Sequence, residues 1–203
     1  MSLELYLIFV AASALLIATP GPNVALIVGT SLRHGARAGL LTAAGVNVGA
    51  FVQISAIALG LTWIVEIFSR HFDLIRYIGA AYLAFLGLQQ LLAKRPPPGA
   101  DVPALRGDRA FGRGLAVAFA NPKTLIFQAA FLPQFLTATS DASTLWLLAL
   151  TFCALAALGD TLYALFAARA RAAVTGRAQL IADKASGAIL LGGAAVLLAA
   201  GRR

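Results

Sequence analysis

The sequence predicts an all-α integral membrane protein with six transmembrane helices, and three observations favour this class. Of the 203 residues, 60% are hydrophobic and only 12% are charged, a composition that suits a bilayer rather than water. Apolar runs long enough to cross a hydrocarbon core of about 30 Å recur along the chain. The first and fourth of these runs contain proline beside polar residues, which predicts broken helices 1 and 4.

The predicted helices divide into two halves around the long polar, proline-rich stretch "AKRPPPGADVPALRGDRA". We expect residues 94–111 to form a cytoplasmic linker. Because each half has an odd number of crossings, the second half enters the membrane from the opposite face, as in a 3+3 inverted repeat. The expected organisation is one polytopic domain, 1–203, with three-helix halves 1–93 and 112–203 and helices near 3–32, 38–67, 72–93, 112–138, 143–168 and 185–201.

The first helix begins without the positive charge of a secretory signal, so we expect it to be retained in the membrane. It then meets "TPGPN". Each proline removes a backbone hydrogen bond, and Gly21 lets the chain turn between Pro20 and Pro22. The freed backbone groups need partners, so such a break survives in a membrane only where it lines protein or a watery cavity. We therefore expect Pro20, Gly21, Pro22 and Asn23 to contact a substrate.

The fourth helix carries a second break, "NPK", in the corresponding position of the other half. Two breaks in matching places suggest one shared cavity, which adds Asn121, Pro122 and Lys123 to the expected binding residues. In the second helix, "GVNVG" is a small-xxx-small pattern that lets another helix approach closely around Asn47.

Four polar residues form a predicted layer near the middle of the membrane, roughly 12–17 Å from its cytoplasmic boundary at about 1.5 Å per residue. They are Asn23, Asn47, Lys123 and Asp160. An ionised side chain at this depth costs at least about 2.5–3.5 kcal/mol, so it should face the bundle interior and find a partner. Either Lys123 and Asp160 form a structural ion pair, or the pair opens to receive a small zwitterion.

In the second alternative, the carboxylate of the zwitterion points toward Lys123 and the helix N-terminus after Pro22, and its ammonium group points toward Asp160. Tyr163 follows Asp160 on the same helix face and could add a hydrogen bond. Asp160 is also the residue we expect to couple transport to protons.

The basic residues between the predicted helices indicate the orientation. One side holds eleven of them, and we assign it to the cytoplasm; the other side holds four and carries both termini. The cytoplasmic set is Arg33, Arg37, Lys94, Arg95, Arg106, Arg109, Arg113, Arg169, Arg171, Arg177 and Lys184, and the outer set is Arg70, Arg76, Arg202 and Arg203.

Several classes of function lack support in the sequence. The net charge of +8 comes from short basic clusters between apolar runs rather than from a nucleic-acid-binding surface. Cys153 is the only cysteine, so one chain cannot build a disulfide framework or a thiolate metal site. The sequence has no HExxH motif, no GxSxG motif and no phosphate-binding loop. It therefore gives no support to an enzyme or to an ATPase. We expect no cofactor.

With "TPGPN", "GVNVG", the basic linker, "NPK" and the intramembrane "GD" at residues 159–160, the chain resembles the LysE-type translocators over nearly its whole length. The resemblance implies a bacterial inner-membrane exporter of amino acids or close derivatives, driven by the proton or another ion gradient and acting as a secondary transporter, for example an antiporter. With no second acid in the polar layer, neutral amino acids are favoured. A homodimer is compatible with the sequence.

Two alternatives remain open at this point. A divalent metal-cation exporter would need oxygen, His or Cys ligands inside the bundle, but His34 and His71 fall in predicted loops. A non-transporting membrane scaffold would not need an intramembrane charge pair beside two broken helices.

Overall fold

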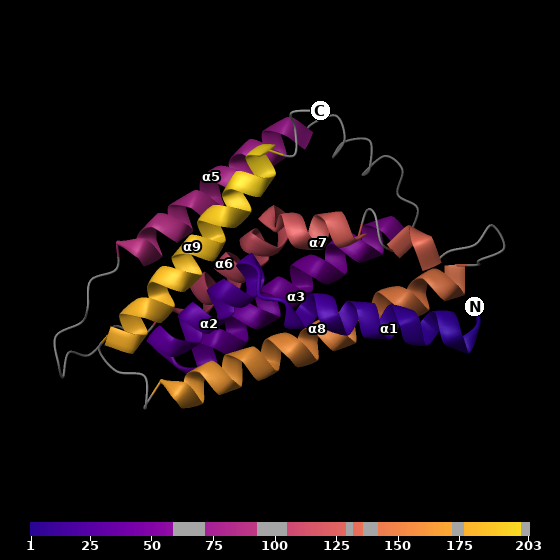
Figure 1. The fold of residues 1–203 in the computed structure, drawn as a ribbon, viewed down its shortest axis with the longest axis horizontal. Coiled ribbons are helices and arrows are strands. Elements are labelled where there is room, and N and C mark those ends of the chain that lie inside the picture. Colours follow the sequence, from indigo (N-terminus) through magenta and orange to yellow (C-terminus); the bar gives the residue numbers. More distant parts are fainter. Residues whose placement is uncertain (59–71, 93–104, 129–131, 136–141, 172–176, 200–203) are drawn as a thin grey trace.

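The computed structural model describes residues 1–58, 72–92, 105–128, 132–135, 142–171 and 177–199 (Figure 1). These residues form α-helices, a short 3-10 helix and no strand, which confirms the all-α prediction. The elements are α1 (Leu3–Ala18), α2 (Pro22–His34), α3 (Ala36–Ala58), α5 (Phe72–Leu91), α6 (Gly107–Ala120), α7 (Pro122–Ile126), η2 (Leu132–Phe135), α8 (Ala142–Ala170) and α9 (Arg177–Ala199).

Within the described residues, three helices are long and apolar enough to cross a membrane, and a bent pair can form a fourth span. The three are Ala36–Ala56 of α3, Ser143–Ala170 of α8 and Leu180–Ala199 of α9, and the pair is α1 with α2. Large apolar side chains cover their outer surfaces, such as Leu15, Leu158 and Phe166. This surface suits lipid, because a soluble domain seldom exposes so large an apolar area.

The helix boundaries differ from the prediction where polar residues form a first turn. α6 begins at Gly107 rather than at 112, and α9 begins at Arg177 rather than at 185. Counting apolar runs misses such turns, although their backbone hydrogen bonds continue the helix. Residues 59–67 of the second predicted helix, and 129–131 and 136–138 of the fourth, lie outside the described residues.

Close helix crossings at glycines hold the bundle together. A Cβ atom added at Gly45 of α3 would lie 2.1 Å from the Phe111 carbonyl oxygen, and one added at Gly114 of α6 would lie 2.1 Å from the Thr42 carbonyl oxygen. The predicted close approach around "GVNVG" therefore occurs between α3 and α6. Gly87 of α5 and Gly187 of α9 form a similar crossing. Such glycines let backbones meet in a membrane, where hydrophobic burial cannot drive helix association.

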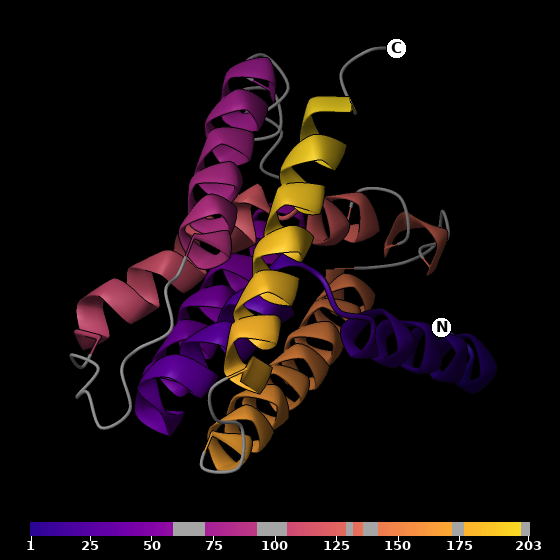
Figure 2. The ribbon, with the colours of Figure 1, turned by 60° about the vertical axis from the view of Figure 1, so that its left-hand side comes forward.

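Helix α2 lies inside the bundle and contacts α3, α6, α8 and α9. In both ribbon views, the C-terminal ends of α2 and α8 and the N-terminal end of α9 lie at the same end of the molecule (Figures 1 and 2). We call this the basic end, because Arg33, Arg169 and Arg171 belong to these helix ends.

Candidate substrate cavity

The first helix is broken where the sequence predicted it. α1 ends at Ala18, Gly21 is the N-cap of α2 in an extended conformation, and Pro22 occupies the first turn of α2. Proline suits that position, because its missing N–H would have no intrahelical acceptor there. The two helices meet at an angle of 50°.

The second break lies at Asn121, between α6 and α7. The side-chain Oδ1 of Asn121 accepts a hydrogen bond of 3.0 Å from the Lys123 backbone N–H, so Asn121 caps α7. Pro122 again occupies the first turn of the following helix. Both breaks thus share one plan: a helix stops, extended backbone follows, and proline starts the next helix. Three residues, 19–21, intervene at the first break and only Asn121 at the second.

Side chains from the second half of the chain satisfy the backbone carbonyls that the first break leaves open. Lys123 Nζ donates hydrogen bonds to the carbonyl oxygens of Leu16 and Thr19. The Tyr163 hydroxyl donates to the Ala18 carbonyl oxygen at 2.8 Å. A cation at this position also faces the negative end of the α1 dipole. Lys123 and Tyr163 therefore hold the end of α1 against α7 and α8.

Asp160 lies in α8 with 5% of its surface exposed. Its Oδ2 accepts a hydrogen bond of 3.0 Å from Asn47 Nδ2, and the same Asn47 amide nitrogen donates to the Ala43 carbonyl oxygen at 2.9 Å. Asn47 Oδ1 is buried without a partner among the described residues, and so is Asn23 Oδ1. The amide oxygens of Asn23 and Asn47 and the second carboxylate oxygen of Asp160 thus remain available to hydrogen-bond donors.

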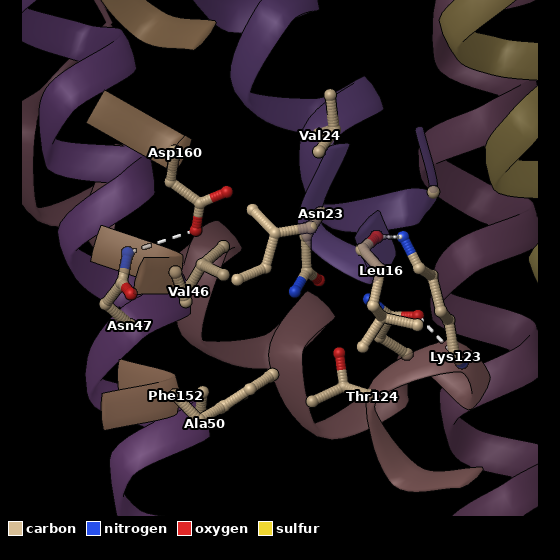
Figure 3. A pocket seen from close by; sticks show the side chains of 14 residues that line it. Leu16, Asn23, Val24, Val46, Asn47, Ala50, Lys123, Thr124, Phe152 and Asp160 are labelled. Atoms are coloured by element: carbon tan, nitrogen blue, oxygen red, sulfur yellow. Dashed lines mark hydrogen bonds between the residues drawn. The ribbon is translucent and has the colours of Figure 1, made fainter. Parts of the chain in front are cut away.

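These groups line one cavity, which we call the midplane cavity after the depth that the sequence predicts for its polar residues (Figure 3). Asp160 and Asn47 lie on one side, Lys123 lies on the opposite side, and Asn23 lies between them in this view. Its volume is about 50 Å³, and since a buried water needs about 10–15 Å³, it has room for a few waters. The lining residues are Leu16, Ile17, Gly21, Asn23, Val24, Val46, Asn47, Ala50, Asn121, Lys123, Thr124, Phe152, Ala156 and Asp160.

The structure brings six of the predicted site residues into this lining and leaves four outside it. Gly21, Asn23, Asn47, Asn121, Lys123 and Asp160 line the cavity, whereas Pro20, Pro22, Pro122 and Tyr163 do not. Pro22 is buried and lies close to Gly193 of α9, and the Tyr163 hydroxyl bonds the end of α1. Binding of substrate by any of these residues stays a prediction.

The structural ion pair considered from the sequence is not present in the described structure. Lys123 and Asp160 have different hydrogen-bond partners and form no ion pair with each other within 4.0 Å. The sequence could not decide this, because the pairing depends on how α7 and α8 are rotated about their axes.

Sequence reasoning missed the apolar wall of the cavity and the hydroxyl of Thr124. Val24, Val46 and Phe152 contribute to this wall, but a buried apolar residue looks the same in sequence whether it lines a cavity or fills a core. Thr124 directly follows "NPK", and this position beside a predicted break could have indicated that it lines the cavity. Within the part of the chain that the structure describes, no three His, Cys, Asp or Glu side chains gather as a metal site.

The fold and cavity define a class: helical membrane proteins in which two broken helices meet at a small polar cavity. Comparison of the sequence with known families identifies the family within this class to which the chain belongs. The profile of the LysE type translocators matches residues 14–201, and the chain belongs to this family of membrane transport proteins.

Curated relatives cover most of the chain. It is 32% identical over 201 residues to a homoserine/homoserine lactone efflux protein of Salmonella typhimurium, with 94% of each chain covered. It is 31% identical over 151 residues to a leucine efflux protein of Klebsiella pneumoniae, with 72% of this chain and 71% of the relative covered. No solved structure matches the chain.

Proposed function

We infer that this protein is a secondary transporter that exports neutral amino acids or close derivatives across the bacterial inner membrane. The observation that carries this proposal is the placement of Asp160 and Lys123 on opposite sides of one cavity between two broken helices. A cation and an anion held apart match the two charged groups of a zwitterion. The efflux activities named for the relatives support the same direction of transport.

The spare hydrogen-bonding capacity of the cavity suits the two ends of an amino acid. A Lys ammonium group has three donors, and Lys123 uses two of them on α1 carbonyls, which leaves one for a carboxylate. The open N–H groups at the start of α2 favour the same anion. On the other side, Asp160 has one oxygen that accepts from Asn47 and a second one for the ammonium group.

The side chain of the substrate would lie against the apolar wall. Ile17, Val24, Val46 and Phe152 favour an aliphatic or small side chain, and a second acid for a cationic side chain is missing from the described lining. The midplane cavity is smaller than an amino acid, so binding must enlarge it. Movement of α1 relative to α2 about the break at residues 19–21 would do this, with Lys123 and Tyr163 releasing the end of α1.

The rest of the transport scheme is part of the same proposal. Six spans in a 3+3 inverted repeat would place the two breaks in symmetric positions, with both termini outside. Protons would supply the energy through Asp160, the acid beside the substrate ammonium group. Without metal donors gathered in the described cavity, export of a divalent cation gains no support.

An export assay tests the proposal. Cells that overproduce the protein would be loaded with labelled leucine, homoserine, threonine or lysine, and efflux would be compared with that of cells carrying the empty vector. We expect faster efflux of leucine or homoserine, no change for lysine, and loss of the difference when a protonophore collapses the proton gradient. If efflux of all four amino acids is the same in overproducing cells and in cells with the empty vector, the proposal is wrong.

A further inference from the structure

A second polar cavity lies at the basic end, and the transport scheme above does not use it. Its volume is about 390 Å³, which is within the range of about 300–1,000 Å³ that is typical of ligand pockets. We call it the basic-end cavity. It lies between α2, α5, α6 and α9, and its lining is Leu26, Gly29, Thr30, Arg33, His34, Leu86, Gln89, Gln90, Leu105, Arg113 and Asp183.

Asp183 is the unusual group in this cavity. Only 7% of its surface is exposed, yet it forms no hydrogen bond or ion pair with any residue that the structure describes. Its carboxylate oxygens reach the cavity rather than the closed core, and the positive charge of Arg33 acts on them there. A carboxylate this deeply placed is costly unless a partner, a ligand, an ion or ordered water satisfies it. Sequence reasoning missed Asp183, because this residue precedes the predicted start of the last helix at 185.

Positive charge and an unsatisfied amide share the same cavity. Arg33 of α2 and Arg113 of α6 both line it, and Arg113 Nη2 donates to Gln89 Oε1 at 3.3 Å. Gln90 Oε1 is buried without a partner among the described residues. Guanidinium groups bind carboxylates with two parallel hydrogen bonds. The cavity therefore offers donors for a carboxylate and acceptors for an ammonium group.

One face of α2 connects the two cavities. Asn23 lines the midplane cavity, and Leu26, Thr30 and Arg33 line the basic-end cavity. The spacing of three or four residues between them places all four on one side of the helix. From Asn23 to Arg33 the distance along the axis is roughly 15 Å at about 1.5 Å per residue. Leu26 and Leu86 also belong to the apolar core of α2, α5, α6 and α9, which closes the route in this structure.

We propose that the basic-end cavity is a loading site for the exported amino acid, with Asp183 binding its ammonium group and Arg33 and Arg113 binding its carboxylate. This inference rests on the proposed function and adds a second binding site to it. An amino acid from the cytoplasm would bind here first and then pass along α2 to the midplane cavity when the core around Leu26 opens.

Everted membrane vesicles test the loading site, because their cytoplasmic face is open to the bath. Uptake of labelled leucine or homoserine would be measured against concentration for the wild type and for Asp183→Asn. Loss of a charge-assisted hydrogen bond should raise KM by about tenfold or more, with a smaller change in the maximal rate. Lys184→Gln removes an exposed charge from the next residue of α9 and serves as the matched control.

Analogues without the ammonium group separate charge recognition from a general effect on folding. 4-Methylpentanoate and 4-hydroxybutanoate keep the carboxylate and side chain of leucine and homoserine. Their inhibition of uptake should be unchanged by Asp183→Asn but weakened by Arg113→Gln. Asp183→Glu should restore part of the affinity. If Asp183→Asn is poorly folded, Arg113→Gln and the analogues still decide the question.

The outcomes distinguish the two proposals. If wild-type vesicles accumulate neither leucine nor homoserine, the proposed function is wrong. If the wild type accumulates one of them and both Asp183→Asn and Arg113→Gln keep the wild-type KM, export stands and the loading site is wrong. A raised KM in Asp183→Asn with an equal loss of inhibition by the carboxylate analogue would also overturn the assignment of Asp183 to the ammonium group.

Discussion

Lys123 shows how one residue can serve both the structure and transport. Its ammonium group caps the broken end of α1 and lies across the midplane cavity from Asp160. A substrate carboxylate would compete with the α1 carbonyls for the same donors. Substrate binding and release of α1 would then be linked through a single side chain, which is the kind of differential contact that a conformational change requires.

Asp160→Asn tests the charge on the other side of the cavity. The variant can keep a hydrogen bond to Asn47, because an amide oxygen can also accept it, so we expect folded protein in the membrane. Losing a buried charge partner costs about 2–5 kcal/mol of binding, and export should fall by more than about tenfold. Efflux of labelled leucine and homoserine would be measured.

Asp108→Asn is the matched control for that experiment. Asp108 lies in the first turn of α6 with 63% of its side chain exposed. A hydrogen bond from the backbone N–H of Arg109 is the main cause that lowers its pKa, and the Arg106 side chain lowers it further. The control therefore makes the same chemical change at an exposed carboxylate. Export at the wild-type rate by Asp160→Asn would make Asp160 a structural residue.

At the scale of the elements, the two breaks matter because they are built alike and face one cavity. In each, proline starts a helix whose first N–H groups have no intrahelical acceptor. The two ends are held differently: Asn121 caps α7 with its own side chain, whereas Gly21 at the start of α2 has none. The N-terminus of α2 is therefore the one left open to an anion.

Replacing Pro20, Gly21 and Pro22 together by alanine should make α1 and α2 continuous. Alanine supplies the missing N–H groups and favours the helix over proline by about 3 kcal/mol per residue in a helix interior. Straightening the bend also withdraws the α1 carbonyls from Lys123 and Tyr163, so we expect little net change in melting temperature but loss of export. Efflux and thermal unfolding of the purified protein would measure both.

Pro98→Ala, a proline replacement in the linker sequence, is the control for this variant. Its efflux should equal that of the wild type. If the triple alanine variant exports as well as Pro98→Ala does, the break is a packing kink, and the first helix has no role in the site.

For the whole molecule, the basic end and the loading site require a defined orientation. Positive residues concentrate in cytoplasmic loops, and the basic-end cavity can load from the cytoplasm only if this end faces inward. We expect Asp101→Cys in a Cys153→Ser background to resist an impermeant thiol reagent in intact cells and to react in everted vesicles. Ser69→Cys, on the predicted outer side, should show the opposite pattern. Labelling of position 101 from outside would reverse the orientation.

The sequence by itself determined that the protein lies in lipid, that it is helical, and where two of its helices break. These properties are local: transfer of apolar side chains into lipid depends on composition, and proline interrupts a helix through its own missing N–H. It also selected six residues that line the midplane cavity, although it missed Thr124. The first turns of α6 and α9 were missed, since a polar helix start carries no apolar signal.

Only the tertiary structure decided which polar groups meet. Lys123 bonds α1 rather than Asp160, and Asn47 rather than Lys123 bonds Asp160. Asp183 lines a second cavity together with two arginines from other helices. Each pairing depends on the rotation and crossing of helices far apart in the chain. Those are set by close contacts such as Gly45 with Phe111, and a side chain's direction in space is not encoded in its own neighbours along the sequence.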